Sequence, residues 1–353
     1  MKVGIIGFTR SGKTTIYNAL TGSQAAVGTF GSRDANIAVL KVPDDRIEKL
    51  SEIYKPKKKT YAEFQFVDIA PNESAGQDKA LDGNALNILK NVDALVHVVC
   101  AFENEEVMHP HGSTDPARDC KALEEELQIC DLIVIEKRIE RLTKEHKTKE
   151  REFELMNRLK EFIEGGKSLR DMDLGAQESR DIAGFGFLSR KPILLLGNYG
   201  EATIGKDDPA GLKAYSESTG IAHFDLCGAM EMEVAQLPDE ERQTFREELG
   251  LGEESRTHFL KTAYDMLGLM SFLTAGEPEV RAWTIRKGMK AVEAAGAIHS
   301  DIQRGFIRAE IVAYKDFMAD GTMAKAKEHG HLRLEGKEYV MQDGDIVLFR
   351  FNV

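Results

Sequence analysis

Short apolar runs alternate with amphipathic stretches along the first part of the chain. The segment that starts at Thr15 has helical spacing, whereas other runs are short and rich in β-forming residues. Those predicted strands cover residues 1–6, 35–42, 60–67, 94–100, 192–197 and 221–226. Alternation of this kind predicts an α/β, doubly wound fold with a mostly parallel sheet, continuing into a helix that ends near Met270.

Residues 130–164 carry many charges around a thin line of apolar side chains, which is too narrow for a globular core. A break near residues 146–148 would fold this stretch into an antiparallel helical hairpin, closed by Gly165 and Gly166 and followed by a loop-like stretch to about Arg190. We therefore predict a coiled-coil-like insertion. It is either a solvated spacer or a docking point that uses the basic residues at its tip, Lys144, Lys147, Lys149 and Arg151.

The carboxyl-terminal residues have a different pattern, with several short predicted strands close together. Residues 282–286, 306–313, 346–351 and the region of 339–340 read as strands, with a turn at 343–345. They predict a small sheet domain with a helix or two, beginning near Ser271. The expected division is a first part of the α/β domain at 1–127, the hairpin at 128–166, a second part of the α/β domain at 167–270 and the small domain at 271–353.

Composition narrows the class of protein. The chain has 353 residues, 42% of them hydrophobic, and its apolar runs are all shorter than the ~20 residues of a membrane helix. Its start resembles a strand more than a leader peptide, so we expect a cytoplasmic protein without membrane association. The four scattered cysteines suggest reduced thiols. A formal net charge of −12 argues against broad coating by nucleic acid, although a local basic patch could still contact RNA.

The residues after the first predicted strand fit the phosphate-binding pattern G-x-x-x-x-G-K-[ST], from Gly7 to Thr14. Glycines let such a loop curl so that backbone N–H groups point at phosphate oxygens. Lys13 is expected to bring charge to the β- and γ-phosphates, which makes it a catalytic candidate, and Thr14 to hold Mg²⁺. The pattern predicts binding of ATP or GTP through Thr9, Arg10, Ser11, Gly12, Lys13, Thr14 and Thr15.

Two further strand ends carry polar residues suited to a nucleotide. Asp68 ends an apolar strand, where a carboxylate is expected to hold Mg²⁺ through water. After residues 192–197, Asn198 and Glu201 offer an amide and a carboxylate for a purine edge, although a solvated pair is the commoner meaning of so short a pattern. The predicted residues on the base side are Asn198, Tyr199, Glu201, Cys227 and Gly228.

Together these stretches resemble the YchF/Obg-like ATPases, a branch of the translation-factor-related P-loop GTPases. Residues 198–201 look like the family's N-x-x-E motif, which replaces the usual N-K-x-D and is linked to relaxed base choice and ATP use. The hairpin falls between Asp68 and that motif, as in the family. Residues 272–276, 279–284, 305–310 and 342–345 look like its TGS domain.

The resemblance covers essentially the whole chain. It implies a P-loop NTPase with a small α+β TGS domain of the ubiquitin-like β-grasp type. It also implies a cytoplasmic nucleotide hydrolase that associates with ribosomes.

The chain departs from the family around the phosphate loop and the switches. Where family members have Pro-Asn-Val, this chain has Thr9-Arg10-Ser11, so Arg10 either supplies a fixed guanidinium in place of a monovalent cation or points to solvent. At Pro71 the family has a glycine whose N–H contacts the γ-phosphate, and proline has no N–H to donate. The switch at this position should therefore respond more weakly to the γ-phosphate of a bound triphosphate.

The neighbouring switch positions differ as well. Ile37 aligns with the threonine that normally completes the Mg²⁺ shell, and Ser32 or Thr29 are the candidates to replace it. Asn72 stands where ordinary GTPases have a water-orienting glutamine, but its side chain is one carbon shorter, so we do not assign it a catalytic role.

Three functions compete on these grounds. The favoured one is a slow, Mg²⁺-dependent ATPase or GTPase that acts as a monomeric switch on the ribosome or a translation partner. The second is a nucleotide-binding adaptor that has lost hydrolysis and binds ribosome, RNA or protein through the TGS domain and hairpin, which Pro71 and Ile37 favour. The third, a small-molecule kinase, fits a base motif followed by a TGS-like domain poorly.

Overall fold

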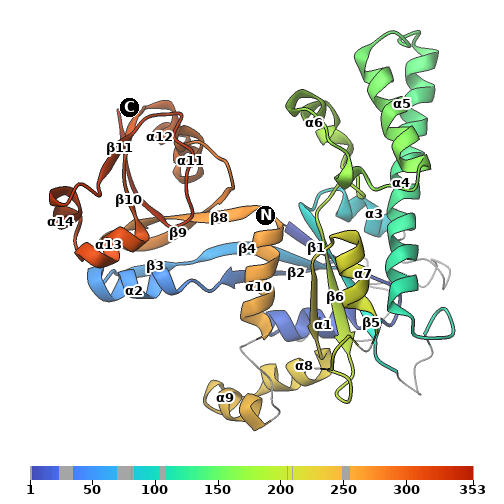
Figure 1. Ribbon diagram of the computed structural model, residues 1–353, viewed down its shortest axis with the longest axis horizontal. Coiled ribbons are helices and arrows are strands. Elements are labelled where there is room, and N and C mark those ends of the chain that lie inside the picture. The colour runs from blue at the N-terminus through green and yellow to red at the C-terminus, as the bar shows by residue number, and fades with distance from the viewer. Residues whose placement is uncertain are drawn as a thin grey trace. The chain divides into compact units, whose positions relative to one another are not determined.

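A computed structural model describes residues 2–23, 35–69, 81, 83–103, 109–204, 206–208, 210–248 and 255–352 of the chain. Contacts divide the chain into two compact units (Figure 1). Unit 1 comprises residues 1–39 and 65–256, and unit 2 comprises residues 40–64 and 257–353. The four-part division expected from the sequence is a finer one and stays a prediction. That residues 40–64 group with the carboxyl-terminal residues is a feature that the sequence reading lacked.

A six-stranded sheet in the order β2-β4-β1-β5-β6-β7 organises unit 1. Its strands are β1 (Lys2–Ile6), β2 (Asn36–Val42), β4 (Ala62–Asp68), β5 (Ala94–Ala101), β6 (Ile193–Tyr199) and β7 (His223–Leu226). β1 pairs in parallel with β4 and β5, and β6 pairs in parallel with β5 and β7. All eight residues of β5 are buried, as expected for a parallel strand covered on both faces. The predicted parallel sheet is therefore present.

Helices connect these strands. They are α1 (Lys13–Thr21), α3 (Gly83–Leu89), α4 (Pro116–Lys144), α5 (Arg151–Glu164), α6 (Ala176–Ile182), α7 (Leu212–Thr219), α8 (Gly228–Gln236) and α9 (Asp239–Glu248). Leu123 and Leu127 of α4 share a buried cluster with Ile6, Val67 and Leu95 of the sheet. The amino-terminal half of α4 thus covers the sheet.

α4 begins well before the start predicted for the charged helix. Asp115 caps it, since its carboxylate accepts a hydrogen bond from the N–H of Arg118 at 3.0 Å, and Pro116 occupies the first turn, where its missing N–H costs nothing. The predicted break near residues 146–148 lies between α4 and α5, which run side by side as a hairpin (Figure 1). The first half of α4 packs on the sheet, so the charge pattern marked only its second half.

The apolar line of the hairpin is covered rather than solvated. Ile135, Leu155, Leu159 and Ile163 are buried with residues from the segment after the hairpin, Leu169, Ile182 and Phe187. That segment, which the sequence suggested was loop-like, contains α6 and two short 3-10 turns, at Leu169–Asp171 and Ala183–Phe185. The hairpin's narrow seam is sufficient because this segment supplies the other half of a small core.

One buried carboxylate fixes the segment to the hairpin. Asp131 of α4 accepts hydrogen bonds from the N–H of Leu188 at 2.8 Å, from the N–H of Ser189 at 2.7 Å and from the Ser189 hydroxyl at 2.6 Å. Burial raises the pKa of Asp131, and these donors oppose the shift.

Unit 2 contains a second six-stranded sheet, in the order β11-β10-β12-β8-β9-β3. Its strands are β3 (Lys58–Thr60), β8 (Leu269–Ala275), β9 (Glu279–Arg286), β10 (Phe306–Ala313), β11 (Arg333–Glu335) and β12 (Asp345–Phe351). Its helices are α2 (Asp45–Tyr54), α10 (Ser255–Met266), α11 (Ala291–Ile298), α12 (Ser300–Arg304), α13 (Tyr314–Asp320) and α14 (Met323–Glu328). β8 pairs antiparallel with β9 and parallel with β12, so the sheet is mixed.

Two sequence predictions are corrected in unit 2. Met270 lies inside β8, so the preceding helix ends earlier than predicted, at Met266. Val340 forms only an isolated bridge to Lys290, and Tyr339 beside it lies in no strand. The aromatic residues Phe306, Trp283 and Tyr339 belong to or pack against the core of this unit.

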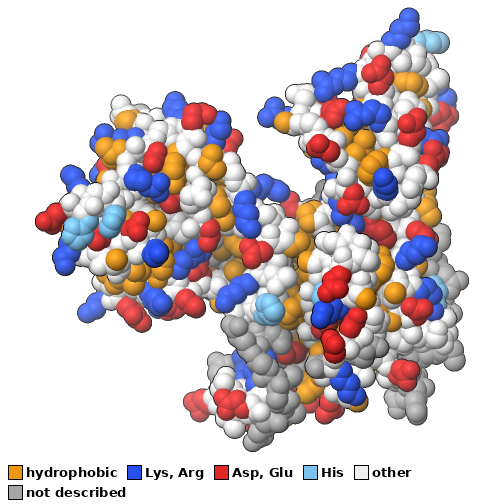
Figure 2. Space-filling view, viewed as in Figure 1, with side chains coloured by type: hydrophobic (Ala, Val, Ile, Leu, Met, Phe, Trp, Pro, Cys, Tyr) orange, Lys and Arg blue, Asp and Glu red, His pale blue; other side chains and the backbone are white. Residues whose placement is uncertain are grey.

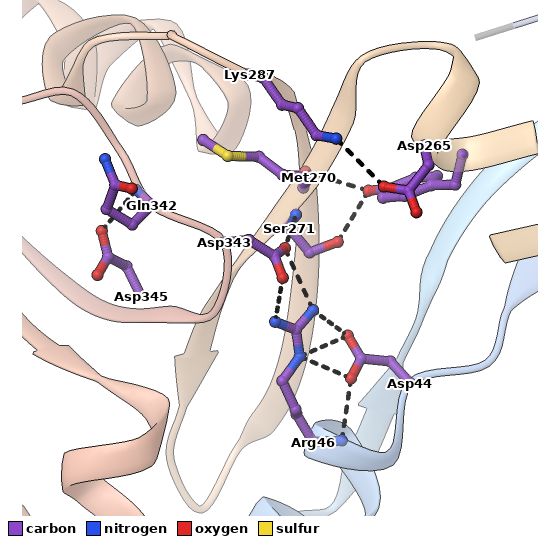
Figure 3. A network of polar contacts seen from close by, with 10 residues as sticks. Asp44, Arg46, Asp265, Met270, Ser271, Lys287, Gln342, Asp343 and Asp345 are labelled. Carbon is purple, nitrogen blue, oxygen red and sulfur yellow. Dashed lines mark hydrogen bonds and ion pairs between the residues drawn. The ribbon is translucent and has the colours of Figure 1, made fainter. Parts of the chain in front are cut away.

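Residues 40–64 are tied into unit 2 by an ion-pair network (Figure 3). The Arg46 guanidinium at the start of α2 pairs with Asp44 at 2.8 Å and with Asp343 at 2.7 Å. Asp343 also accepts a hydrogen bond from the backbone N–H of Ser271 at 2.9 Å. Arg46, Asp44, Asp343 and Ser271 all line a pocket of about 470 Å³ in the same unit. The 342–345 stretch singled out in the sequence thus contributes a structural anchor.

Candidate nucleotide-binding site

The phosphate-loop sequence forms the connection between β1 and α1, as predicted. Gly12 adopts φ +90° immediately before the first residue of α1, and a Cβ atom there would lie 2.2 Å from the side-chain nitrogen of Asn198. Only glycine meets both demands, the left-handed backbone and the close approach. The amino end of α1 exposes backbone N–H groups and positive helix-dipole charge, which is the geometry that favours phosphate.

Lys13, the first residue of α1, turns its ammonium back onto the loop. Its Nζ donates hydrogen bonds to the carbonyl oxygens of Gly7 at 2.7 Å and Phe8 at 2.8 Å. Burial lowers the pKa of Lys13 to about 8, although the charge of Asp68 acts in the opposite direction. A buried ammonium held by neutral carbonyls is poorly compensated, so an anion at this position would stabilise it.

Thr14 and Asp68 meet at the end of β4, as a magnesium site requires. The Thr14 hydroxyl lies 3.2 Å from Oδ2 of Asp68, and the Asn36 amide nitrogen donates to the same oxygen at 3.4 Å. The other carboxylate oxygen, Oδ1, is buried without a hydrogen-bond partner among the residues that the structure describes. Burial raises the pKa of Asp68. A hydroxyl beside a carboxylate with an unsatisfied oxygen fits a hard cation such as Mg²⁺.

Asn198 links the base-side loops to the phosphate loop. Its buried amide donates to the carbonyl oxygen of Ser11 at 3.0 Å and accepts from the N–H of Gly228 at 3.0 Å. One of its two N–H groups and one of its two oxygen lone pairs already bind backbone, so the amide has one of each left for a purine base. Asn198 thus holds the end of β6, the phosphate loop at Ser11 and the start of α8 at Gly228 together.

The remaining predicted base-side residues divide by burial. Tyr199 is 3% exposed and Cys227 is 2% exposed, so both are enclosed by protein. Burial raises the pKa of the Tyr199 hydroxyl. Gly228 opens α8, and a Cβ atom there would lie 2.8 Å from Ile16 and 3.0 Å from the Asn198 oxygen. Glu201 is exposed just after β6 and can reach a ligand.

The rest of the phosphate loop lies in one curl. Arg10 is exposed and holds φ +70°, a left-handed conformation that is uncommon outside glycine. Ser11 is buried, whereas Thr9 and Thr15 are partly exposed. Ile37 is 57% exposed on β2. Pro71, Asn72, Ser32 and Thr29 lie outside the described residues.

Three histidines near this site were missed by the sequence reading. His97 is buried on β5, and burial with the charge of Lys13 lowers its pKa to about 3, so it is neutral. His109 Nε2 lies 2.9 Å from the buried carboxylate of Asp119. His111 packs its ring edge against Phe8 of the loop, with centroids 4.9 Å apart. The signal available in the sequence was only the His-x-His spacing.

Two family models match the chain. The model described as "50S ribosome-binding GTPase" matches residues 2–138, and YchF-GTPase_C, described as "Protein of unknown function (DUF933)", matches residues 269–352. The first match therefore lies in the predicted α/β region, and the second covers the predicted carboxyl-terminal sheet domain.

Relatives of known name match over the full length. "Ribosome-binding ATPase YchF" of Bacillus subtilis (strain 168) is 42% identical over 100% of both chains, and that of Escherichia coli O157:H7 is 36% identical over 100% of this chain and 99% of its own. A solved structure, "Structure of the Schizosaccharomyces pombe YchF GTPase", superimposes with a TM-score of 0.84 at 30% identity, covering 99% of this chain and 97% of that one. The matches show a P-loop GTPase fold and confirm the predicted resemblance: the chain belongs to the YchF family.

Proposed function

We propose that this protein is an Mg²⁺-dependent nucleoside triphosphatase that binds ATP or GTP at the loop preceding α1 and acts as a switch associated with the ribosome. The observation that carries the proposal is the convergence of Lys13, Thr14 and Asp68 at one strand edge, where one Asp68 oxygen has no hydrogen-bond partner in the described part of the chain. The names of the relatives, ribosome-binding ATPases and a GTPase, support the same function.

Each residue of the site has a role in this proposal. Lys13 would exchange the loop carbonyls for phosphate oxygens and neutralise charge during transfer. Thr14 and Asp68 would hold Mg²⁺, which supplies charge neutralisation to the phosphates. Asn198 acts as a positioning residue, since it holds the loop at Ser11 and the start of α8. Exposed Glu201 is left to contact the base.

The choice between ATP and GTP follows from the residues available to the base. Asn198 already binds two backbone partners, which leaves one N–H and one lone pair of its amide for the base, and a carboxylate such as Glu201 accepts hydrogen bonds from the amino and ring N–H groups of either purine. We therefore propose binding of both nucleotides, with the names "ATPase" and "GTPase" among the relatives consistent with this.

The remaining assignments extend the proposal to partners. We infer that β8–β12 with their helices form a TGS domain of the β-grasp type and that the α4–α5 hairpin docks on the ribosome through its basic tip. The protein would act as a cytoplasmic monomer, with RNA contact made by local basic patches. No helix in the described part of the chain is long and apolar enough to cross a membrane. The ATPase names of the relatives favour the hydrolase over the adaptor that has lost hydrolysis.

Binding and turnover measured together test the proposal. Calorimetry on the nucleotide-stripped protein with Mg²⁺ gives the affinities for ATP and GTP, and single-turnover hydrolysis follows in the same samples, with and without ribosomes. Lys13→Ala should abolish both, whereas Lys121→Ala, an exposed lysine on α4, should leave both unchanged. Tight binding without turnover, even beside ribosomes, would refute the hydrolase and leave the adaptor.

A further inference from the structure

Two histidines and a buried aspartate meet on the surface of unit 2, far in sequence from the phosphate loop. Nδ1 of His329 lies 2.6 Å from Oδ1 of Asp320, and Nδ1 of His331 lies 2.7 Å from Oδ2 of the same carboxylate. The three candidate ligand atoms all lie within 4.8 Å of one another. Figure 2 shows histidine side chains gathered on the surface over α14.

The backbone fixes all three side chains. Asp320 is the last residue of α13, and the chain turns at once through Gly321 into α14, which Thr322 caps by accepting a hydrogen bond from the N–H of Lys325. At the other end of α14, Gly330 adopts φ +78°, and the N–H of His331 bonds back to the carbonyl of Ala326 at 2.8 Å. This helix-ending turn folds His331 back beside His329. The cluster is therefore built on two helix ends rather than on free side chains.

Burial and exposure are divided in a way that suits a metal ion. The Asp320 side chain is 4% exposed, whereas those of His329 and His331 are 54% and 41% exposed. The carboxylate is thus held in place by the protein, and the imidazoles remain open to an ion arriving from solvent. Asp316, one turn earlier on α13, adds a second negative charge that acts on His331.

We propose that Asp320, His329 and His331 form a binding site for one divalent transition-metal ion of the Zn²⁺ class. A set of two imidazoles and one carboxylate binds Zn²⁺, Ni²⁺ and Cu²⁺ in preference to Mg²⁺ or Ca²⁺. With metal–ligand bonds of about 2.1 Å in a tetrahedral site, neighbouring ligand atoms lie about 3.4 Å apart. The ring nitrogens, now 2.6 and 2.7 Å from the carboxylate oxygens, would move outward by several tenths of an ångström, and any pair of ligand atoms as far apart as the 4.8 Å limit would close on the ion. The fourth position remains open to water.

Protons compete with the metal at this site. Nδ1 of each ring lies within hydrogen-bond distance of the Asp320 carboxylate, and the tautomer with its proton on Nδ1 makes these hydrogen bonds when no metal is bound. Binding through Nδ1 moves the ring proton to Nε2, which leaves each imidazole neutral. A metal ion and a proton therefore compete for Nδ1 of each ring.

Calorimetric titration of the full-length, chelator-treated protein with ZnCl₂ tests the proposal. Millimolar Mg²⁺ is present throughout to occupy the hard-cation site at Asp68. We expect one equivalent of Zn²⁺ to bind, with affinity reduced at least ~10-fold in His329→Ala and in His331→Ala, because even outer-shell changes cost that much. The matched control is His299→Ala, which removes an exposed imidazole 3.3 Å from the Asp301 carboxylate on α12.

Co²⁺ gives a second readout that does not depend on affinity. The wild type should show the intense visible absorption of low-coordinate Co²⁺, and His331→Ala should show only the weak bands of the hydrated ion. Unchanged zinc affinity in both histidine variants would overturn the proposal, as would a Co²⁺ spectrum of the hydrated ion in the wild type. Because both histidines are exposed, their variants should fold, and far-ultraviolet circular dichroism checks this.

Discussion

The lowered pKa of Lys13 predicts that nucleotide binding takes up a proton. Without nucleotide, burial holds this pKa at about 8 instead of 10.5, which corresponds to about 3 kcal/mol against the charged form. Phosphate oxygens favour the charged form and should restore the ordinary pKa. At pH 8 about half of the Lys13 side chains are neutral, so binding should take up about half a proton, against about one-tenth at pH 7 and nine-tenths at pH 9.

The sign of the pH dependence follows from the same shift. Since the pKa of the folded, nucleotide-free protein lies below the ordinary value, charged Lys13 is disfavoured there, and the stability of this state rises as the pH increases from about 8 toward 10.5. Nucleotide affinity should move in the opposite direction and fall about tenfold between pH 7 and pH 9. The terminal phosphate of the nucleotide, with a pKa near 6, is already ionised in this range.

Calorimetry in two buffers that differ in ionisation enthalpy measures the proton directly. Lys13→Arg, which stays charged throughout, should bind without proton uptake, and the melting temperature of Lys13→Met should lack the rise with pH seen in the wild type. Less than a tenth of a proton taken up at pH 8.5, together with parallel melting curves for wild type and Lys13→Met, would refute the reasoning.

Three further substitutions probe other contacts described above. Gly12→Ala should weaken nucleotide binding by about 1–3 kcal/mol, because φ is +90° and the new Cβ would meet Asn198; Gly22→Ala, also left-handed but in open space, is its control in the same titration. Arg46→Met should destabilise α2 by about 2 kcal/mol and so speed the hydrogen exchange of its amides. Arg350→Met, which breaks an exposed ion pair, should leave the exchange of α2 unchanged. Equal protection of the α2 amides in both variants would contradict the anchoring role of Arg46. Asp131→Asn should lower the free energy of unfolding by about 2 kcal/mol, since an amide accepts through one oxygen only, and the melting temperature should fall accordingly. An unchanged melting temperature would show that the carboxylate is dispensable.

Local patterns predicted the fold of unit 1 well. The phosphate loop could be recognised because its chemistry is confined to contiguous residues, and a strand such as β5 because eight adjacent residues are buried together. Thr14 and Asp68 lie within contact of each other because parallel strands deliver their carboxyl ends to one edge of the sheet, while their role toward Mg²⁺ stays a prediction.

Contacts between distant segments were not predictable in the same way. The commitment of Asn198 to Ser11 and Gly228 depends on how closely three loops approach, and no residue pattern encodes that distance. The start of α4 was misplaced because packing on the sheet, rather than charge, sets its first turns. The pairing of His109 with Asp119 has no motif at all, since it depends on the turn into α4.

The placement of residues 40–64 in unit 2 has a consequence for synthesis on the ribosome. β3 pairs with β9, and the contact between Thr60 and Glu279 spans 219 residues of chain. At about 5–20 residues per second, β3 emerges roughly 10–45 s before the strand that it joins. During that interval the three-residue strand β3 and the helix before it have no sheet to join, so unit 2 can fold only after all of unit 1 has been made. In a nascent chain halted before β9, the segment with α2 and β3 would stay exposed and accessible to chaperones.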